Sequence, residues 1–225
     1  MLNKTQILDW ASRLIDENVD NLKDPQGLIT HLEGVYDVAQ EVVRGVTAQY
    51  PGIPFVGEEV CLAAGLHDFG RPLRKDQMFH ELRSAQYIDE HGLANGVAHS
   101  EVDVFRIAQM VRSHGPIYER WTDEGNASYR EEFGNLDFCL LLPTSWQAAI
   151  VAYADLASMG GERVDPLERL EAGIRKYRDD PKYKSERMVR SLMVSKERFG
   201  ILCRRVEALE QGQLTEQEIA RFGFL

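Results

Sequence analysis

Residues 63–75 read AAGLHDFGRPLRK, and this stretch places a histidine and an aspartate side by side at the end of a helix. Gly70 and Pro72 stop helix propagation, so the helix is expected to finish at about His67. Neighbouring side chains cannot point the same way within one helical turn. At a helix end, however, the backbone can bend so that both His67 and Asp68 reach one ion.

Helical signals cover nearly the whole chain, and strand signals are scarce. Apolar residues recur at helical spacing, and capping residues such as Asp24 before Pro25 and Ser100 before Asp103 mark helix starts. Helices are expected at about residues 5–19, 24–48, 57–67, 77–90, 100–115, 144–159, 165–178 and 182–210, with a short one from 215. Residues 116–143 are expected to form a long ordered loop or short helices, and are a candidate lid or substrate wall. The sequence therefore predicts an all-α bundle.

Size and charge limit the classes of function. A chain of 225 residues with 44% hydrophobic content suits one compact domain, with or without a helical extension. The formal net charge of −10 disfavours binding to nucleic acid polymers and to anionic membranes. A small phosphorylated substrate remains compatible, provided that its pocket carries its own cations.

Features of the sequence also point to a cytoplasmic location. No apolar stretch is long enough to cross a bilayer, and the amino terminus lacks the pattern of a secretory signal. Cys61, Cys139 and Cys203 are odd in number and widely spaced, which is typical of buried thiols in a reducing compartment rather than of disulfides or a zinc site.

The other chemically notable residues also lie near helix ends or on apolar faces. His31 lies on the apolar side of the second expected helix, His80 begins the fourth and His114 ends the fifth. Asp155 lies within an alanine-rich helix, where an unpaired buried carboxylate would cost several kcal/mol. Taken singly, each has an ordinary explanation: a hydrogen-bonded core histidine, a helix start, a C-cap, or a carboxylate that is exposed or in a salt bridge.

Taken together, these residues occur in the order H…HD…H…H…D, and in this the chain resembles proteins of the HD superfamily. The resemblance covers residues 27–159. GLHDFGRP is similar to the family's apolar-HD-apolar-Gly-Lys/Arg stretch. HELRSAQYI is similar to its H-x3-[GS]-A helix start, with Ser84 where glycine is usual, and YADLAS to its closing AD segment.

The resemblance implies an HD-like helical bundle, which with the N-terminal helix is expected to span residues 1–162. Residues 163–225 lie outside the resemblance and are expected to form a helical extension packed on the same bundle. It implies that His31, His67, Asp68 and Asp155 hold one metal ion. His80 and His114 would hold a second ion, with Asp68 bridging; the alternative for these two histidines is a surface helix start and a C-cap. Nitrogen and oxygen ligands suit Fe, Mn, Co, Ni, Zn or Mg. His91 and His99 flank glycines in a turn-like stretch and are expected to be exposed non-ligands.

The leading functional hypothesis is hydrolysis of a phosphate ester or anhydride by metal-activated water, on a small nucleotide-like compound. Small single-domain members that hydrolyse dinucleoside polyphosphates are the nearest resemblance. Asp68 is expected to orient the water and Arg71 to hold the phosphoryl oxygens. The further candidates for substrate binding are Arg74, Lys75 and Arg83, with Arg112 close to His114. Arg74 and Lys75 have an equally good explanation as part of a solvated basic loop.

Two other classes of function stay open. Some HD proteins with this ligand arrangement use a di-iron centre to activate oxygen, and a degenerate member would be a non-catalytic binding or sensor module. The helix expected at 182–210 carries Met188, Leu192, Val194, Phe199, Leu202 and Val206 at amphipathic spacing. It is expected to pack back on the bundle, with a homodimer contact as the alternative.

Overall fold

The computed structural model of the chain describes residues 1–53, 55, 57–134 and 136–222, apart from the side chains of 129, 138 and 139. The predicted all-α fold is confirmed. The α-helices are α1 (Lys4–Glu17), α2 (Pro25–Gln49), α3 (Gly57–Leu66), α4 (His80–His91), α5 (Glu101–Arg112), α6 (Ile117–Thr122), α7 (Ala127–Phe133), α8 (Trp146–Leu156), α9 (Pro166–Asp179), α10 (Glu186–Glu210) and α11 (Glu216–Ala220). Short 3-10 turns span Val19–Asn21, Glu124–Asn126 and Phe138–Leu141, and the strands β1 (Ser158–Met159) and β2 (Glu162–Arg163) form an antiparallel hairpin.

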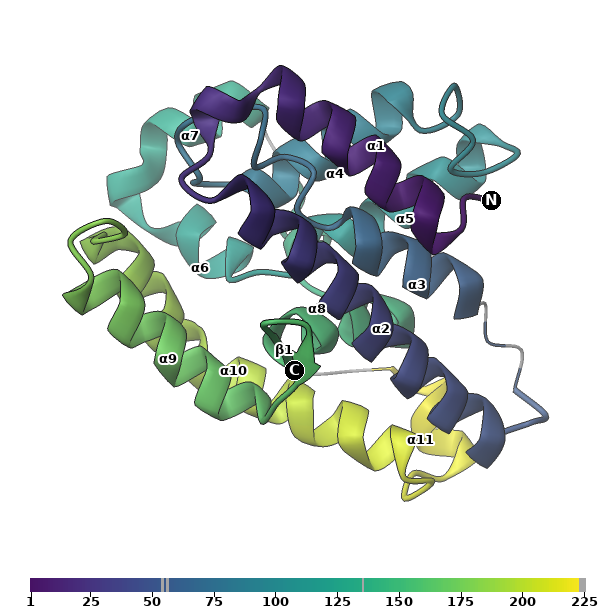
Figure 1. Cartoon of the computed structure of the whole chain (residues 1–225). Coiled ribbons are helices and arrows are strands. Elements are labelled where there is room, and N and C mark those ends of the chain that lie inside the picture. The colour runs from purple at the N-terminus through teal and green to yellow at the C-terminus, as the bar shows by residue number, and fades with distance from the viewer. Residues whose placement is uncertain (54, 56, 135, 223–225) are drawn as a thin grey trace.

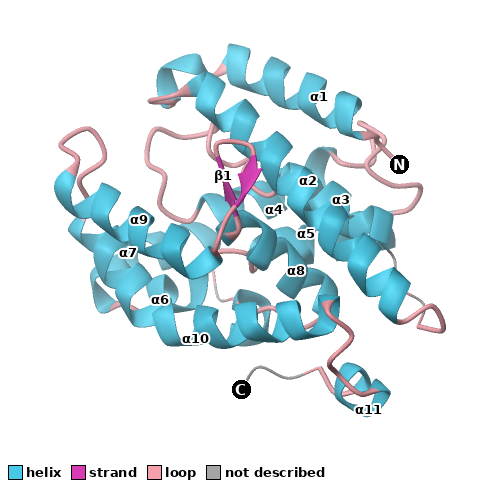
Figure 2. Cartoon of the chain, turned by 60° about the horizontal axis from the view of Figure 1, so that its bottom comes forward, coloured by secondary structure: helices cyan, strands magenta, loops and turns pink. Residues whose placement is uncertain are grey.

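The bundle is built around α2, α3, α5 and α8, which contact one another and enclose the main core. α8 is deeply buried, because Ala149 to Ala154 are all shielded from solvent. α1 covers α2 and α3, while α9 and α10 run side by side along the opposite edge (Figure 1). The β1–β2 hairpin contacts α2 and lies between it and α9 (Figure 2).

Several helix starts follow directly from the capping residues seen in the sequence. The Asp24 side chain accepts a hydrogen bond from the Gly27 N–H, with Pro25 in the first turn of α2. Ser100 and Ser145 cap α5 and α8 in the same manner. Each cap satisfies a backbone N–H that has no partner within its own helix.

Four of the expected helix boundaries are wrong by three or four residues. The helix expected at 100–115 ends at Arg112, and the one expected at 182–210 begins at Glu186. The helix expected at 77–90 begins at His80, because Phe79 adopts a left-handed backbone (φ 56°, ψ 30°) that interrupts helical geometry. The helix expected to reach Met159 ends at Leu156, where the chain enters the β-hairpin through Gly160 and Gly161, both with positive φ. For the segment 116–143 the alternatives were a long ordered loop or short helices, and the structure has the short helices α6 and α7 there.

The C-terminal part of the chain contributes to the bundle core. Leu202, Cys203 and Val206 of α10 belong to the main core, and Phe199 joins α10 to α9 in a smaller cluster. Val194 is the exception to the expected apolar face, since it is 67% exposed. Cys61 and Cys203 are buried free thiols, and the side chain of Cys139 lies outside the described residues. None of the described helices combines the length and apolar character needed to cross a membrane.

The turn after α3 is tied to the first turn of α4 by a close backbone contact. The Gly70 N–H donates a hydrogen bond to Ser84 Oγ at 2.7 Å. A Cβ added at Gly70 would lie 2.2 Å from the His80 carbonyl oxygen and 2.5 Å from the Ser84 nitrogen. The absence of a side chain at Gly70 therefore lets the His67–Asp68 segment lie against the start of α4.

We expect Gly70→Ala to lower the free energy of unfolding by about 1–3 kcal/mol, because backbone atoms must move to admit the methyl group. Gly52→Ala is the control: a Cβ there would meet nothing within 4 Å, so stability should change by less than about 1 kcal/mol. Urea denaturation of both variants measures the difference. Equal stability of the two variants would show that the contact does not constrain the turn.

Candidate metal centre

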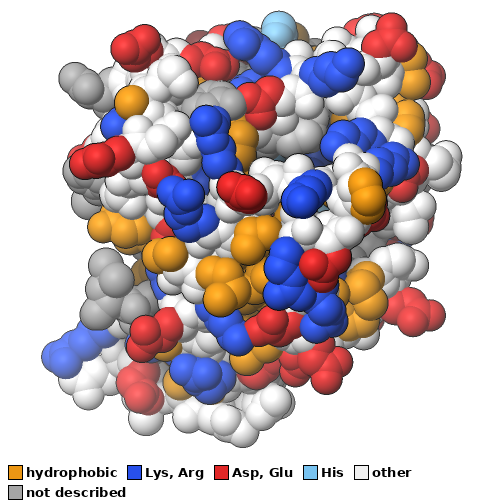
Figure 3. Space-filling view, turned by 90° about the vertical axis from the view of Figure 1, so that its left-hand side faces the viewer, with side chains coloured by type: hydrophobic (Ala, Val, Ile, Leu, Met, Phe, Trp, Pro, Cys, Tyr) orange, Lys and Arg blue, Asp and Glu red, His pale blue; other side chains and the backbone are white. Residues whose placement is uncertain are grey.

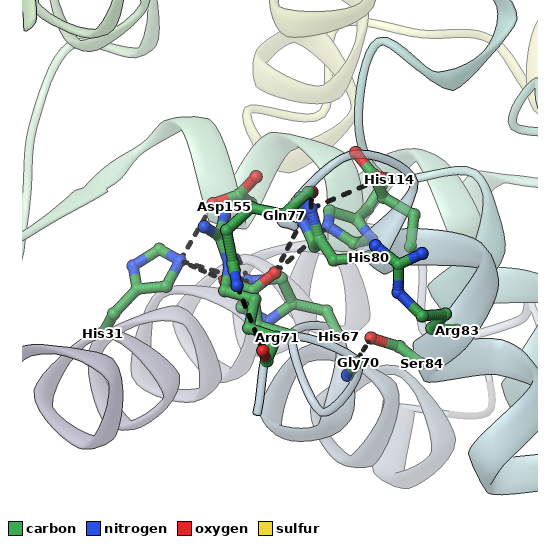
Figure 4. Close-up of polar contacts among 12 residues, drawn as sticks. His31, His67, Gly70, Arg71, Gln77, His80, Arg83, Ser84, His114 and Asp155 are labelled. Atoms are coloured by element: carbon green, nitrogen blue, oxygen red, sulfur yellow. Dashed lines mark hydrogen bonds and ion pairs between the residues drawn. The ribbon is translucent and has the colours of Figure 1, made fainter. Parts of the chain in front are cut away.

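Six side chains from five separate segments meet in one cluster. His31 comes from α2, His67 and Asp68 follow α3, His80 opens α4, His114 follows α5 and Asp155 lies in α8. His31 and Asp155 lie at one end of the cluster and His80 and His114 at the other, with His67 and Arg71 between them (Figure 4). The structure thus brings together all six residues that the resemblance implies as metal ligands.

Four donor atoms form a first group. His31 Nε2 lies 3.1 Å from Asp155 Oδ1 and 3.1 Å from His67 Nε2. His67 Nε2 lies 3.7 Å from Asp155 Oδ1, and Asp68 Oδ2 is 3.5 Å from both imidazole nitrogens. Two ligands bound at right angles to one ion, each at about 2.1 Å, lie about 3 Å apart. The spacing therefore suits one ion between these four atoms.

A second group shares the Asp68 carboxylate. Its other oxygen, Oδ1, lies 2.9 Å from His80 Nε2 and 3.7 Å from His114 Nε2. Asp68 is fully buried and turns one oxygen toward each group. This is the placement expected of a carboxylate that bridges two adjacent ions.

Three of the imidazoles are oriented by the same kind of contact, each with its own backbone carbonyl. Nδ1 of His67, His80 and His114 lies 2.6, 2.9 and 2.6 Å from the carbonyl oxygen of Ala64, Gln77 and Val111, respectively. Each carbonyl belongs to the residue three positions earlier. An imidazole that donates its Nδ1–H to such a carbonyl keeps Nε2 as a lone-pair donor. The Nε2 atoms that face Asp68 are therefore set up to bind a cation.

This hydrogen bonding leaves electron pairs facing one another inside the protein. His80 Nε2 is close to Asp68 Oδ1, yet Oδ1 accepts no hydrogen bond from the described residues. A lone pair held against a carboxylate oxygen is repulsive unless a proton or a metal ion lies between them. The residues present thus fit a metal ion in their chemistry as well as in their spacing.

The electrostatics keep most of this cluster in a ligand-ready form. Burial lowers the pKa of His67 to about 3, and burial together with the Arg71 charge lowers the pKa of His80. Burial opposes ionisation of Asp68, but Arg71 and the imidazoles outweigh it and hold its pKa well below the usual value. For His114, burial favours the neutral form, but Asp68 and Glu81 outweigh it and raise the pKa. A proton on His114 would compete with a metal ion for Nε2.

Arg71 is the cation in direct contact with the cluster. Its Nε donates a hydrogen bond to Asp68 Oδ2, and its side chain is 27% exposed. Burial disfavours the charge on Arg71, but Asp68 outweighs this and raises its pKa. Arg71 therefore stays charged and lies between the buried carboxylate and solvent.

The other basic residues named from the sequence lie differently. Arg83 is buried and donates to the carbonyls of Asp76 and Met78, so its guanidinium holds the loop before α4. Arg112 pairs with Asp89 at 3.7 Å. Arg74 and Lys75 are exposed, with Arg74 3.5 Å from Glu132. Their role in substrate binding stays a prediction, and the contacts of Arg83 favour a structural role for that residue.

The expectation that His91 and His99 lie outside the cluster is confirmed, since both are exposed. A further acidic residue, Glu81, lies at the second group. Glu81 is fully buried, its Oε2 lies 3.5 Å from His80 Nδ1, and Arg120 of α6 lies 2.8 Å from its Oε1. Burial opposes its charge, but Arg120 outweighs it and lowers the pKa of Glu81 to about 2. In the sequence, the position of Glu81 directly after His80 could have indicated it, but no local pattern identifies Arg120 as its partner.

We expect Arg120→Met to lower the free energy of unfolding by about 3–5 kcal/mol, because it leaves the Glu81 charge buried without a partner. Adding Glu81→Gln removes that charge, so the double variant should recover part of the loss. Thermal and chemical denaturation of the metal-free proteins measure both effects. A single variant as stable as the parent would mean that the ion pair does not support this side of the cluster.

Comparisons with known proteins leave the cluster to be interpreted from its own residues. No family model, no curated protein and no solved structure matches the chain.

Proposed function

We propose that this protein is a metal-dependent hydrolase of a phosphate ester or anhydride in a small molecule. One observation carries the proposal: the two oxygens of Asp68 face two groups of imidazole and carboxylate donors, while Arg71 bonds the same carboxylate. The resemblance to HD proteins in ligand order supports the same reading.

Two divalent ions, when bound in these groups, would supply Lewis acidity to the phosphoryl group and lower the pKa of the attacking water. Asp68 would accept a hydrogen bond from that water and orient it, because its carboxylate lies between the two groups. Among the described residues Arg71 uses only its Nε–H, so its other N–H groups are available to bind non-bridging phosphoryl oxygens. The buried side chains of His67 and His80 keep bulk water from the Asp68 carboxylate.

An oxygen-activating di-iron centre would use the same kinds of ligand. Arg71 favours the phosphate reading, because a fixed guanidinium beside the ions matches the charge that develops on a phosphoryl group. Iron content together with substrate-dependent oxygen uptake would instead support the oxygenase. Retention of metal without turnover of any phosphate ester or organic substrate would support a binding or sensor module.

The metal centre is tested by counting ions in the purified protein. We expect about two divalent ions per chain in the parent, and about one in His80→Ala and in His114→Ala, because each removes a ligand of the second group only. Asp68→Ala should lose both metal and activity while retaining its helix content, because both groups share this carboxylate. Metal analysis with circular dichroism measures these effects.

His99→Ala is the matched control for the histidine variants, because it removes an exposed imidazole and should leave the metal content unchanged. An unchanged ratio in His80→Ala and His114→Ala would remove the second ion from the proposal. Turnover by Asp68→Ala with metal still bound would remove Asp68 from the mechanism.

The reaction is tested with metal-reconstituted protein on p-nitrophenyl phosphate, bis-p-nitrophenyl phosphate, nucleotides and dinucleoside polyphosphates. We expect hydrolysis of at least one, and a fall in kcat/KM of about tenfold to a hundredfold in Arg71→Lys, because lysine cannot bond Asp68 and phosphate in the same planar geometry. Arg13→Gln, which removes an exposed positive charge from α1, is the control. Equal activity of Arg71→Lys and the parent would show that Arg71 does not bind the reacting group.

A further inference from the structure

Three lysines gather around one tyrosine ring near Arg71. The ammonium groups of Lys176, Lys23 and Lys182 lie 3.9, 5.2 and 5.3 Å from the centroid of the Tyr183 ring. They come from the end of α9, the turn before α2 and the loop between α9 and α10. We call Lys23, Lys176, Lys182 and Tyr183 the lysine cluster.

The positive charge of the lysine cluster is not neutralised by paired carboxylates. None of the three ammonium groups forms an ion pair with a described residue, and the nearby acids have other partners. Asp179 pairs with Arg178, and Asp180 accepts a hydrogen bond from the Lys182 backbone N–H. Asp180 still acts on Lys176 from a distance. Three like charges on one ring repel one another, which an anion between them would relieve.

Hydrogen bonds and side-chain packing connect the lysine cluster to the segments that carry Arg71 and His80. Lys23 donates a hydrogen bond to the Lys182 carbonyl, which joins the two loops, and Asn21 donates to the Pro72 carbonyl at 2.8 Å, next to Arg71. Tyr177 packs against the cluster that includes Phe79, the residue before His80. Burial lowers the pKa of Lys176, and the charges of Arg169 and Arg71 lower it further. Lys176 and Arg71 therefore interact electrostatically.

The charge on this side contrasts with the acidic character of the whole chain. The formal net charge is −10, yet many Lys and Arg side chains lie on the face that Figure 3 shows, with Asp and Glu side chains among them, and the loop between α9 and α10 lies on this side. A local positive field on an acidic protein attracts anions to one face. Residues 176–183 carry Lys176, Arg178 and Lys182 against Asp179 and Asp180, and they lie beyond the stretch that carries the HD resemblance.

We propose that the lysine cluster is an anion subsite that binds a second phosphate group of the substrate. This inference rests on the proposed function, in which the first phosphoryl group lies at Arg71 and the metal centre. The inferred substrate is therefore a compound with at least two phosphate groups, one at the ions and one held by Lys23, Lys176 and Lys182. The ammonium groups of all three lysines lie against the ring of Tyr183, which spaces them.

The subsite is tested without relying on catalysis. Metal-free protein is titrated calorimetrically with inorganic pyrophosphate at low ionic strength. We expect the affinity to fall about fivefold for each lysine removed in Lys176→Gln and Lys182→Gln, as for exposed charge pairs, and further as salt is added. The double variant Arg175→Gln/Lys184→Gln is the control, because it removes the same charge from the same segment but from outside the lysine cluster.

The outcomes separate this inference from the proposed function. Pyrophosphate binding that weakens in Lys176→Gln/Lys182→Gln and not in the control supports the subsite, even if the metal-loaded protein hydrolyses nothing. Equal weakening in both double variants shows a general effect of charge and overturns it, as does binding unaffected by either. In active enzyme, the lysine variants should raise KM for substrates with two phosphates and leave p-nitrophenyl phosphate turnover unchanged; an equal change for both substrates also overturns the subsite.

Discussion

The carboxylate of Asp68 has no exposed surface, so its charge must be balanced by positive charge within the protein. Arg71 supplies part of this balance at one oxygen, but the other oxygen faces imidazole nitrogens whose protons point away toward backbone carbonyls. That side of Asp68 is electron-rich and enclosed. The remaining features of the centre, from the bend after α3 to the start of α4, hold donors around this carboxylate.

Helix ends do most of this positioning. The carbonyls in the last turn of a helix lack partners within the helix, and those of Ala64 and Val111 accept the Nδ1–H of His67 and His114. One contact thus satisfies the backbone and orients a ligand. Backbone strain appears next to His80. Phe79 has a left-handed backbone and is the one non-glycine residue with positive φ in the described part of the chain. Strain of this kind persists where surrounding contacts require it.

Local chemistry explains which features could be predicted from the sequence. Caps such as Asp24 and Ser145 act within three residues, so their helices were found. The His and Asp residues that meet in the centre were found because each occupies a helix end or an apolar face, and their order matched a known pattern. Whether they bind metal stays a prediction.

The features that were missed depend on contacts between distant segments. The pairing of Glu81 with Arg120, and the use of Arg83 on the carbonyls of Asp76 and Met78, leave no local pattern. The start of α4 was misplaced because the apolar spacing continues through Phe79 although its backbone does not.

The order of the ligands along the chain has a consequence for biosynthesis. His31 leaves the ribosome long before Asp155, and the segments between them contribute the other donors. Domains fold during or after translation as their last core element emerges, and a metal site that needs the fold does not exist in the unfolded chain. A nascent chain can therefore offer only scattered imidazoles until α8 has been synthesised, and a metal ion could meet the complete set of donors only after that point.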